Sequence, residues 1–304
     1  MTIVRAAVDT QPEDLGLALT RRRIRVGDLV FAWVLRLCLL IALAFLVWLV
    51  SFALYKGWNR LDSRLWEGMP VGRISRINQA GVQSAITGTI WVISLTALMC
   101  LPTGIFAAIY LEEYADSTRW YNRLIELNVQ NLAGVPSIIF GILGLGIIAR
   151  QFGLGFSVIT AAIVLSLLAL PVVIIATREA IRAVPQSIRH ASYALGATKW
   201  QTVYRQVLPA AVPGISTGSI LALSRAIGEA APLIVLGAVN FIAFNPDGLQ
   251  SKYTVLPIVI YNYTTRPQAG YQELAAAAIV LLLAIVLLMN SVAIIVRNRF
   301  SKRM

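Results

Sequence analysis

The feature that most restricts the fold is the stretch of residues 82–111, which contains no charged side chain. A helix needs roughly 20 apolar residues to cross the hydrocarbon core of a bilayer, and this stretch is long enough. Five further apolar runs are long enough to do the same, at 37–54, 127–149, 156–177, 213–239 and 274–296. Their length favours helices over strands. The sequence therefore predicts an all-α, polytopic membrane protein with six transmembrane helices.

Composition supports this class and argues against a nucleic-acid-binding protein. The chain is 58% hydrophobic and only 13% charged, whereas soluble domains usually carry about 25% charged residues. A net charge of +12 could indicate a nucleic-acid partner. The basic residues, however, lie in short loops and at the two ends, and no basic surface interleaved with aromatic residues is present. We therefore expect contact with membrane lipid and none with nucleic acid.

Side chains suited to metal or catalytic sites are scarce. Cys38 and Cys100 both fall inside apolar runs, which predicts small core residues rather than a disulfide or a metal site. His190 is the only histidine, so this chain alone cannot build a histidine-based site. We expect no catalytic residues, no metal ligands and no cofactor.

Basic residues predict the orientation of the spans. Four arginines at 21–25 precede the run 37–54, which is longer than the roughly 7–15 apolar residues of a secretory signal. We therefore expect an uncleaved helix. Basic residues are about twice as numerous in the predicted cytoplasmic segments as in the outer ones, so both termini are expected in the cytoplasm. The outer loop 56–81 departs from this bias. It is either a solvated loop or a basic surface for an anionic partner or substrate.

These runs predict the organisation of the chain. Residues 1–28 form a cytoplasmic tail, 29–55 an additional N-terminal transmembrane helix, and 56–81 an extracytoplasmic loop. The main transmembrane domain covers 82–296 and contains a long cytoplasmic loop at 178–212. A basic cytoplasmic tail occupies 297–304.

The loop 178–212 predicts two short helices joined by a tight turn. Pro185 suits the start of the first helix, and Gly196 suits a left-handed C-terminal cap. Thr198 and Gln201 have the spacing of a capping box that opens the second helix. An apolar stripe follows at helical period, formed by Trp200, Val203, Tyr204, Val207 and Leu208. We expect Pro209 and Pro213 to end this helix. The stripe packs either on the protein's own helix ends or in a groove on a partner.

Two charged residues interrupt the run 213–239. Arg225 is expected near mid-membrane and Glu229 one turn further on, on the same face. Charges there are costly and face a polar cavity or another helix. The planar fork of an arginine matches a tetrahedral oxyanion, so Arg225 is a candidate for substrate contact. The alternative is an inert ion pair that fixes helix register.

A second break lies at 134–137, in the run 127–149. Carbonyl groups freed by Pro136, together with Gln130, Asn131 and Ser137, could line a translocation path or an inner gate. An ordinary proline kink satisfied by a neighbouring helix fits the same residues.

The cytoplasmic loop resembles the EAA loop of ABC importer permeases, whose pattern is E-A-A-x3-G-x9-I-x-L-P. Ala191, Gly196, Leu208 and Pro209 match the pattern. His190 stands in place of the acid, Ser192 in place of the second alanine and Gln206 in place of the isoleucine. The resemblance implies that an ATPase subunit docks here. The residues expected to form this coupling loop are Ala191, Ser192, Leu195, Gly196, Thr198, Trp200, Leu208 and Pro209.

Four further stretches, at 128–141, 194–200, 225–233 and 256–262, are similar to phosphate-specific ABC importer permeases. The last of these and the Ala-Pro-Leu at 231–233 resemble the PstA type rather than the PstC type. The resemblance covers residues 83 to the C-terminus and implies a type I ABC importer permease core in a prokaryotic cell membrane. It also implies a PstC-type permease partner, two ATPase subunits, an extracytoplasmic phosphate-binding protein and inorganic phosphate as substrate.

No stretch fits the phosphate-gripping pattern G-x-x-x-x-G-K-[ST], so we expect ATP hydrolysis on partner subunits and no enzyme activity in this chain. Two transport alternatives stay open. One is a permease for another oxyanion, sulfate or molybdate. The other is a proton-coupled secondary transporter with Glu229 as proton carrier. A membrane-embedded enzyme is disfavoured because clustered histidines, paired catalytic carboxylates and a nucleophile motif are missing.

Overall fold

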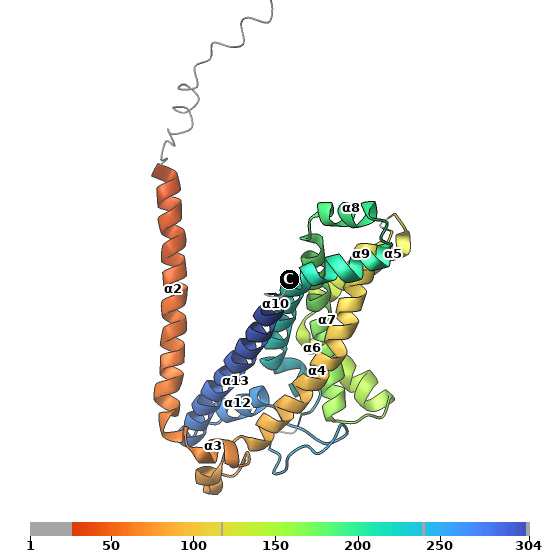
Figure 1. The fold of residues 1–304 in the computed structure, drawn as a ribbon. Helices are drawn as coiled ribbons and strands as arrows, with labels where there is room; N and C mark the ends of the chain where they lie inside the picture. The colour runs from red at the N-terminus through yellow and green to blue at the C-terminus, as the bar shows by residue number, and fades with distance from the viewer. Residues whose placement is uncertain (1–25, 117, 239–240, 302–304) are drawn as a thin grey trace, which may run out of the picture. The chain divides into compact units, whose positions relative to one another are not determined.

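The computed structural model describes residues 26–116, 118–238 and 241–301. Most of the predicted tail 1–28, including its arginines, lies outside these residues, as do 302–304. All regular elements in the described ranges are helices, which confirms the all-α prediction (Figure 1). Five helical segments are long and apolar enough to span a bilayer, and a bent pair of helices brings the number to six.

The chain divides into two units, residues 1–52 and 53–304. The described part of the first unit is the apolar helix α2 (Val26–Gly57), which continues a few residues into the second unit. The described side chains of α2 up to residue 52 are mostly exposed and mostly apolar, as in a helix surrounded by lipid, whereas Ala53 is buried. The prediction of a helix at 37–54 is confirmed, and the helix begins earlier. Cys38 is exposed on α2, so the expected core position holds only for Cys100, which is buried in the second unit.

Short elements follow α2 in the predicted outer loop: η1 (Trp58–Arg60), α3 (Ser63–Glu67) and η2 (Ile74–Gln79). Some of the basic residues here bind within the second unit. Arg60 pairs with Glu273 at 3.5 Å, and Lys56 donates to Gln272 at 2.9 Å. Arg64, Arg73 and Arg76 are exposed.

Three long helices form the centre of the second unit: α4 (Gln83–Ile109), α7 (Val158–Arg182) and α10 (Leu208–Ile227). Helix α7 packs against both others. Gly218 and Gly214 of α10 lie directly against Ala176 and Ala180 of α7, with no room for a Cβ. Such contacts between small residues let membrane helices approach closely. The final helix, α13 (Ala269–Ser301), packs along α10 and α12 (Figure 1).

The two prolines expected to end the second cytoplasmic helix do not end it. Helix runs without interruption from Lys199 to Ile227, through α9 (Lys199–Thr202), the π-turn η5 (Val203–Val207) and α10. Pro209 lies in the first turn of α10, directly after the π-turn. The wider hydrogen-bond register of a π-turn lets the helix continue past a residue that lacks an N–H. The prediction was therefore wrong because the pattern of prolines carries no sign of the π-turn.

The run 127–149 is broken where the sequence predicts. Helix α5 (Trp120–Ala133) ends at Gly134, and α6 (Ser137–Leu143) with η4 (Gly144–Gln151) begins after Pro136, bent by 105° from α5. The run 213–239 is also broken, because α10 ends at Ile227 and the short helix α11 (Ala231–Val235) follows. The unbroken fifth span that we expected is thus replaced by a long helix, a break and one short helix.

The expected outer loop after the fifth span contains a buried helix. Helix α12 (Leu256–Thr264) packs against α13, and its Leu256, Ile258, Val259 and Tyr263 are buried. Its nine residues are too few to span a bilayer, so hydropathy over a long window does not reveal it.

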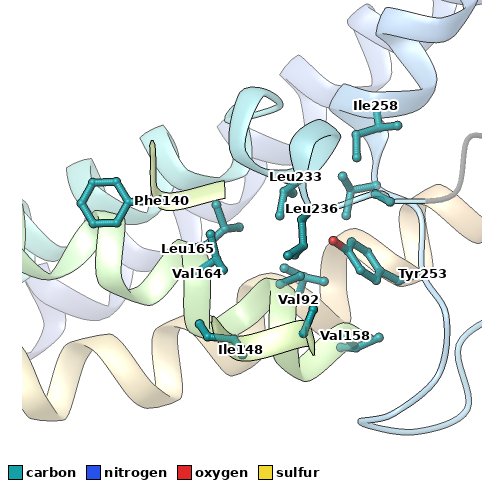
Figure 2. Packing of buried hydrophobic residues seen from close by; sticks show 14 residues of the cluster. Val92, Phe140, Ile148, Val158, Val164, Leu165, Leu233, Leu236, Tyr253 and Ile258 are labelled. Atoms are coloured by element: carbon teal, nitrogen blue, oxygen red, sulfur yellow. The ribbon is translucent and has the colours of Figure 1, made fainter. Parts of the chain in front are cut away.

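One apolar cluster joins α4, α6, α7 and α11 to the chain before α12. Figure 2 shows Val92, Phe140, Leu165, Leu233 and Tyr253 of this cluster. It fixes α6 and α11, the two short helices that follow the two breaks, to the same part of the core.

Candidate functional site

The turn between the two short helices of the loop 178–212 has the predicted geometry. Helix α8 (Gln186–Ala194) ends at Leu195, and Gly196 adopts φ +80°, a left-handed conformation that disfavours any Cβ. The N–H of Gly196 donates to the Tyr193 carbonyl at 2.9 Å, and that of Ala197 donates to the Ser192 carbonyl at 3.2 Å. The predicted glycine cap is confirmed.

The predicted capping box is also present at the start of α9. The hydroxyl of Thr198 accepts from the Gln201 N–H at 3.3 Å, and the Gln201 side chain accepts from the Thr198 N–H at 2.9 Å. Ser192 and Thr202 exchange a hydrogen bond of 2.8 Å between their hydroxyls, which links α8 to α9. The turn is therefore rigid and holds both helices in a fixed relation.

The predicted apolar stripe divides into two halves. Val203 and Val207 are fully buried with Ile109 and Ile181 at the ends of α4 and α7. Trp200 and Tyr204 are 60% and 61% exposed and stack on each other, with ring centroids 5.8 Å apart. Packing on the protein's own helix ends is thus observed for Val203 and Val207. Contact of Trp200 and Tyr204 with a partner stays a prediction.

A groove of about 510 Å³ lies beside the turn, between α8 and α9. Leu195, which is 89% exposed, forms part of its wall. Three more predicted coupling residues line the groove, Ala191, Ser192 and Gly196. The remaining lining residues are Ile188, Ala197, Gln201, Arg205 and Gln206. Leu208 and Pro209 do not line the groove and are half-buried at the start of α10. We call the groove together with Leu195, Trp200 and Tyr204 the cytoplasmic patch, after the side of the membrane that the sequence predicts for this loop.

A buried arginine beneath the cytoplasmic patch was missed by sequence reasoning. Arg189 of α8 binds Glu113 at 2.8 Å, and both side chains are less than 10% exposed. Its guanidinium also donates to the carbonyls of Val184 at 2.7 Å and Ile181 at 3.1 Å. Glu113 lies in the π-turn η3 (Tyr110–Tyr114) at the end of α4. The sequence indicates this pair only through the two carboxylates at 112–113, which directly follow the uncharged run. No neighbouring residue shows that Arg189 is the partner of Glu113.

Arg225 and Glu229 are not on one helical face, contrary to expectation. Arg225 lies exposed in the last turn of α10, and Glu229 lies half-buried in the break after Gly228. Among the described residues, Arg225 and Glu229 form no ion pair with each other or with any other side chain. The helix ends between them because the chain turns at Gly228, whose N–H donates to the Arg225 carbonyl at 3.2 Å. The alternative of an inert ion pair is therefore not observed.

The other predicted path residues lie around the first break. Gln130 and Asn131 are exposed in the last turn of α5, and Ser137 begins α6. Helix α6 then packs on α11, where Gly141 lies directly against the Pro232 backbone. The fold thus brings together the segments that follow the two breaks, with Phe140 and Leu233 in one cluster (Figure 2).

Comparison with known proteins agrees with this architecture. Residues 100–304 match the family described as "Binding-protein-dependent transport system inner membrane component". This chain belongs to that permease family. The permease is therefore a multi-pass inner-membrane protein that works with a separate ATPase and a binding protein, and it is not itself an enzyme.

Two relatives and two solved structures illustrate the similarity. The phosphate transport system permease protein PstA 1 of Mycobacterium tuberculosis is 35% identical over 86% of each chain. The PstA of Yersinia pestis is 32% identical over 87% of each chain. Among structures, a permease chain of a bacterial alginate ABC transporter superposes with TM-score 0.59 at 19% identity, over 91% of this chain and 98% of that one. A chain of the MetNI methionine ABC transporter superposes with TM-score 0.58 at 20% identity. This match covers 71% of the permease and 96% of the MetNI chain. The permease is of the PstA type, and the likeness to the two structures concerns the fold.

Proposed function

We propose that this permease forms half of the path by which inorganic phosphate enters the cell, and that a PstC-type permease subunit forms the other half. The observation that carries the proposal is the similarity to PstA permeases over most of the chain. The four sequence stretches quoted above for the phosphate-specific type support it, since they form α5–α6, the α8–α9 turn, the break after α10, and α12.

The cytoplasmic patch is the proposed docking site for the ATPase. Leu195, Trp200 and Tyr204 present apolar surface to water beside a groove, whereas Val203 and Val207 anchor the same helix in the core. An exposed aromatic pair next to a pocket is the kind of surface that contributes most to protein binding. Two ATPase subunits, one on each permease of the pair, would move α8 and α9 when ATP binding closes them.

Both termini are proposed to lie in the cytoplasm. Arg297 near the end of α13 donates to Thr217 of α10 at 2.8 Å, and this end of α13 lies toward the α8–α9 side of the second unit (Figure 1). Arg182, Lys199 and Arg205 are exposed on that side, which agrees with the excess of positive charge on cytoplasmic segments. The phosphate-binding protein would then dock at the opposite end, near α3 and α12.

Arg225 is the proposed contact for phosphate within the path. Its guanidinium is exposed in this subunit and is not neutralised by an ion pair, so two parallel hydrogen bonds to an oxyanion are available. Glu229, half-buried in the break just beyond, is proposed as a second polar residue of the path. Gln130, Asn131 and Ser137 line the path at the first break.

The test is ATP hydrolysis by the complete importer, purified with its partner subunits. Phosphate-loaded binding protein is expected to stimulate hydrolysis, and binding protein loaded with sulfate or molybdate is expected not to. Stimulation by sulfate or molybdate instead would move the assignment to that oxyanion. Absence of any stimulation in an intact complex would contradict the proposed function.

A further inference from the structure

Ion pairs join the cytoplasmic helix α8 to the broken span α5–α6, and the proposed function does not use them. The first link is the pair between Arg189 and Glu113 described above. Moving α8 away from the end of α4 would break this buried ion pair. Moving it away from the end of α7 would break the two hydrogen bonds from the arginine to the carbonyls of Ile181 and Val184.

The second link lies at the neighbouring residue of the same π-turn. Glu112 accepts from Arg182 at 2.9 and 3.0 Å in a bidentate arrangement, and from Arg178 at 3.2 Å. Arg178 and Arg182 are one turn apart on α7. Glu112 and Glu113 therefore connect two different sets of arginines through a single turn of backbone.

The third link reaches α5. The second guanidinium nitrogen of Arg178 binds Glu126 at 2.8 Å, and the arginine side chain is only 12% exposed. In the described part of the chain this is the only ion pair formed by α5. Glu126 lies one helical turn before Gln130, so the contact is made just ahead of the predicted path residues and of the 105° bend.

We propose that Arg178 and Arg189 are positioning residues, which pass the movement of α8 to α5 by way of Glu112 and Glu113. The proposal rests on ATPase docking at the cytoplasmic patch. Both carboxylates lie in a π-turn, a local irregularity often found at functional sites, so a small shift of the turn displaces both sets of arginines together. α5 responds because the bend at Gly134–Pro136 leaves it free to rotate relative to α6.

This route differs from the continuous helix α9–α10. That helix carries the motion of the docking patch toward Arg225 through backbone hydrogen bonds and apolar packing. The ionic route ends instead at the first break. The two routes would move the two sides of the path together.

The experiment uses the complete importer in liposomes and measures phosphate taken up for each ATP hydrolysed. Glu126→Gln and Arg178→Gln are expected to lower this ratio roughly 2- to 30-fold, the range for changes along a coupling network. Stimulation of ATP hydrolysis by the binding protein is expected to remain, since the docking patch is untouched. The double variant is expected to be no worse than the poorer single variant, because both remove the same contact.

Two further variants separate positioning from simple stability. Glu126→Asp keeps the charge on a shorter side chain. Its ratio of phosphate uptake to ATP hydrolysis is expected to lie between those of Glu126→Gln and the wild type, and its complex is expected to assemble in wild-type amounts. Asp116→Asn, which removes the exposed pair with Arg119 just before α5 but no link of the route, is the matched control and should leave the ratio unchanged.

If Glu126→Gln and Arg178→Gln both take up as much phosphate per ATP hydrolysed as the wild type, the inference is overturned. The proposed function as a phosphate importer would be unaffected. Should Glu126→Gln fail to assemble, nucleotide-induced changes in hydrogen exchange of the wild-type importer that are confined to α8–α10 and absent from α5 would overturn it equally. If the wild-type complex itself moves no phosphate, the proposed function fails instead.

Discussion

Two segments of this permease contain prolines between apolar stretches, and the two behave in opposite ways. At Pro209 and Pro213 the helix continues from α9 into α10, whereas at Pro136 the chain bends by 105° between α5 and α6. Before Pro209, a π-turn anchored by the buried Val203 and Val207 absorbs the missing hydrogen bond. Before Pro136, Gly134 ends the helix, and no such anchor precedes it. Pro102 in α4 and Pro171 in α7 also lie inside continuous helices, so a proline alone does not decide where a helix of this permease ends.

The difference gives the two segments different mechanical roles. The continuous helix extends from Lys199 to Arg225, roughly 40 Å at 1.5 Å per residue, and joins the docking patch to the predicted phosphate contact. In the proposed mechanism the bent segment is a hinge, and the ion pair between Arg178 and Glu126 contacts one arm of it.

The largest expected effect comes from the far end of the continuous helix. Arg225→Gln is expected to lower phosphate uptake by about 100-fold or more, because a neutral amide cannot supply the charge-assisted bidentate contact. Arg225→Lys keeps the charge without the planar fork and should retain part of the flux. Uptake of labelled phosphate into liposomes measures both, and undiminished flux in Arg225→Gln would remove this residue from the path.

The next effect concerns the docking end of the same helix. Replacing Trp200 and Tyr204 together by alanine is expected to weaken ATPase binding about 30-fold, since aromatic anchors at an interface contribute on the order of 1 kcal/mol each. Retention of the ATPase during purification and its dissociation constant report the change. Trp120→Ala is the control, because this tryptophan is 76% exposed on α5 but lies outside the patch. Equal binding by all variants would contradict the docking assignment.

A smaller effect tests the two prolines directly. Pro136→Ala is expected to let α5 straighten toward α6 and to lower uptake a few-fold, whereas Pro209→Ala should change little because the helix is already continuous there. Spin labels on the exposed Leu124 and Ile142, in a background with Cys38 replaced, report the bend as a distance. The distance should lengthen only in Pro136→Ala. Lengthening in neither variant would show that packing alone fixes the bend.

The smallest effect is local to the α8–α9 turn. Gly196→Ala places a Cβ on a residue at φ +80° and is expected to cost about 1 kcal/mol of stability. The midpoint of thermal unfolding of the purified complex measures it. Ala197→Gly is the matched control, because it also changes one methyl group in the same turn but at a residue without a left-handed backbone. An unchanged midpoint in Gly196→Ala would show that the turn relaxes to accommodate the methyl group.

Local chemistry predicted the features that depend on a few neighbouring residues. The glycine cap at Gly196, the capping box at Thr198 and the break before Ser137 each depend on side chains within one or two turns, and all three are present. Long apolar runs likewise predicted the spanning helices, because length alone separates them from strands.

Features that depend on distant residues could not be predicted in this way. Arg189 and Glu113 are 76 positions apart, and neither residue carries a local sign of its partner. The burial of α12 depends on α13 and α4 and not on its own short length. The placement of Glu229 outside the helix of Arg225 depends on where α10 ends, which the apolar pattern leaves open.

Labelled phosphate uptake by the reconstituted importer is the most direct test of the account. Liposomes would contain the permease, its partner permease and the ATPase, with ATP inside and phosphate-loaded binding protein outside, on the side away from the ATPase. The account predicts accumulation of phosphate that requires both ATP and the binding protein, and none when a pH gradient is imposed without ATP. Accumulation driven by the pH gradient alone would contradict the account and indicate a proton-coupled carrier.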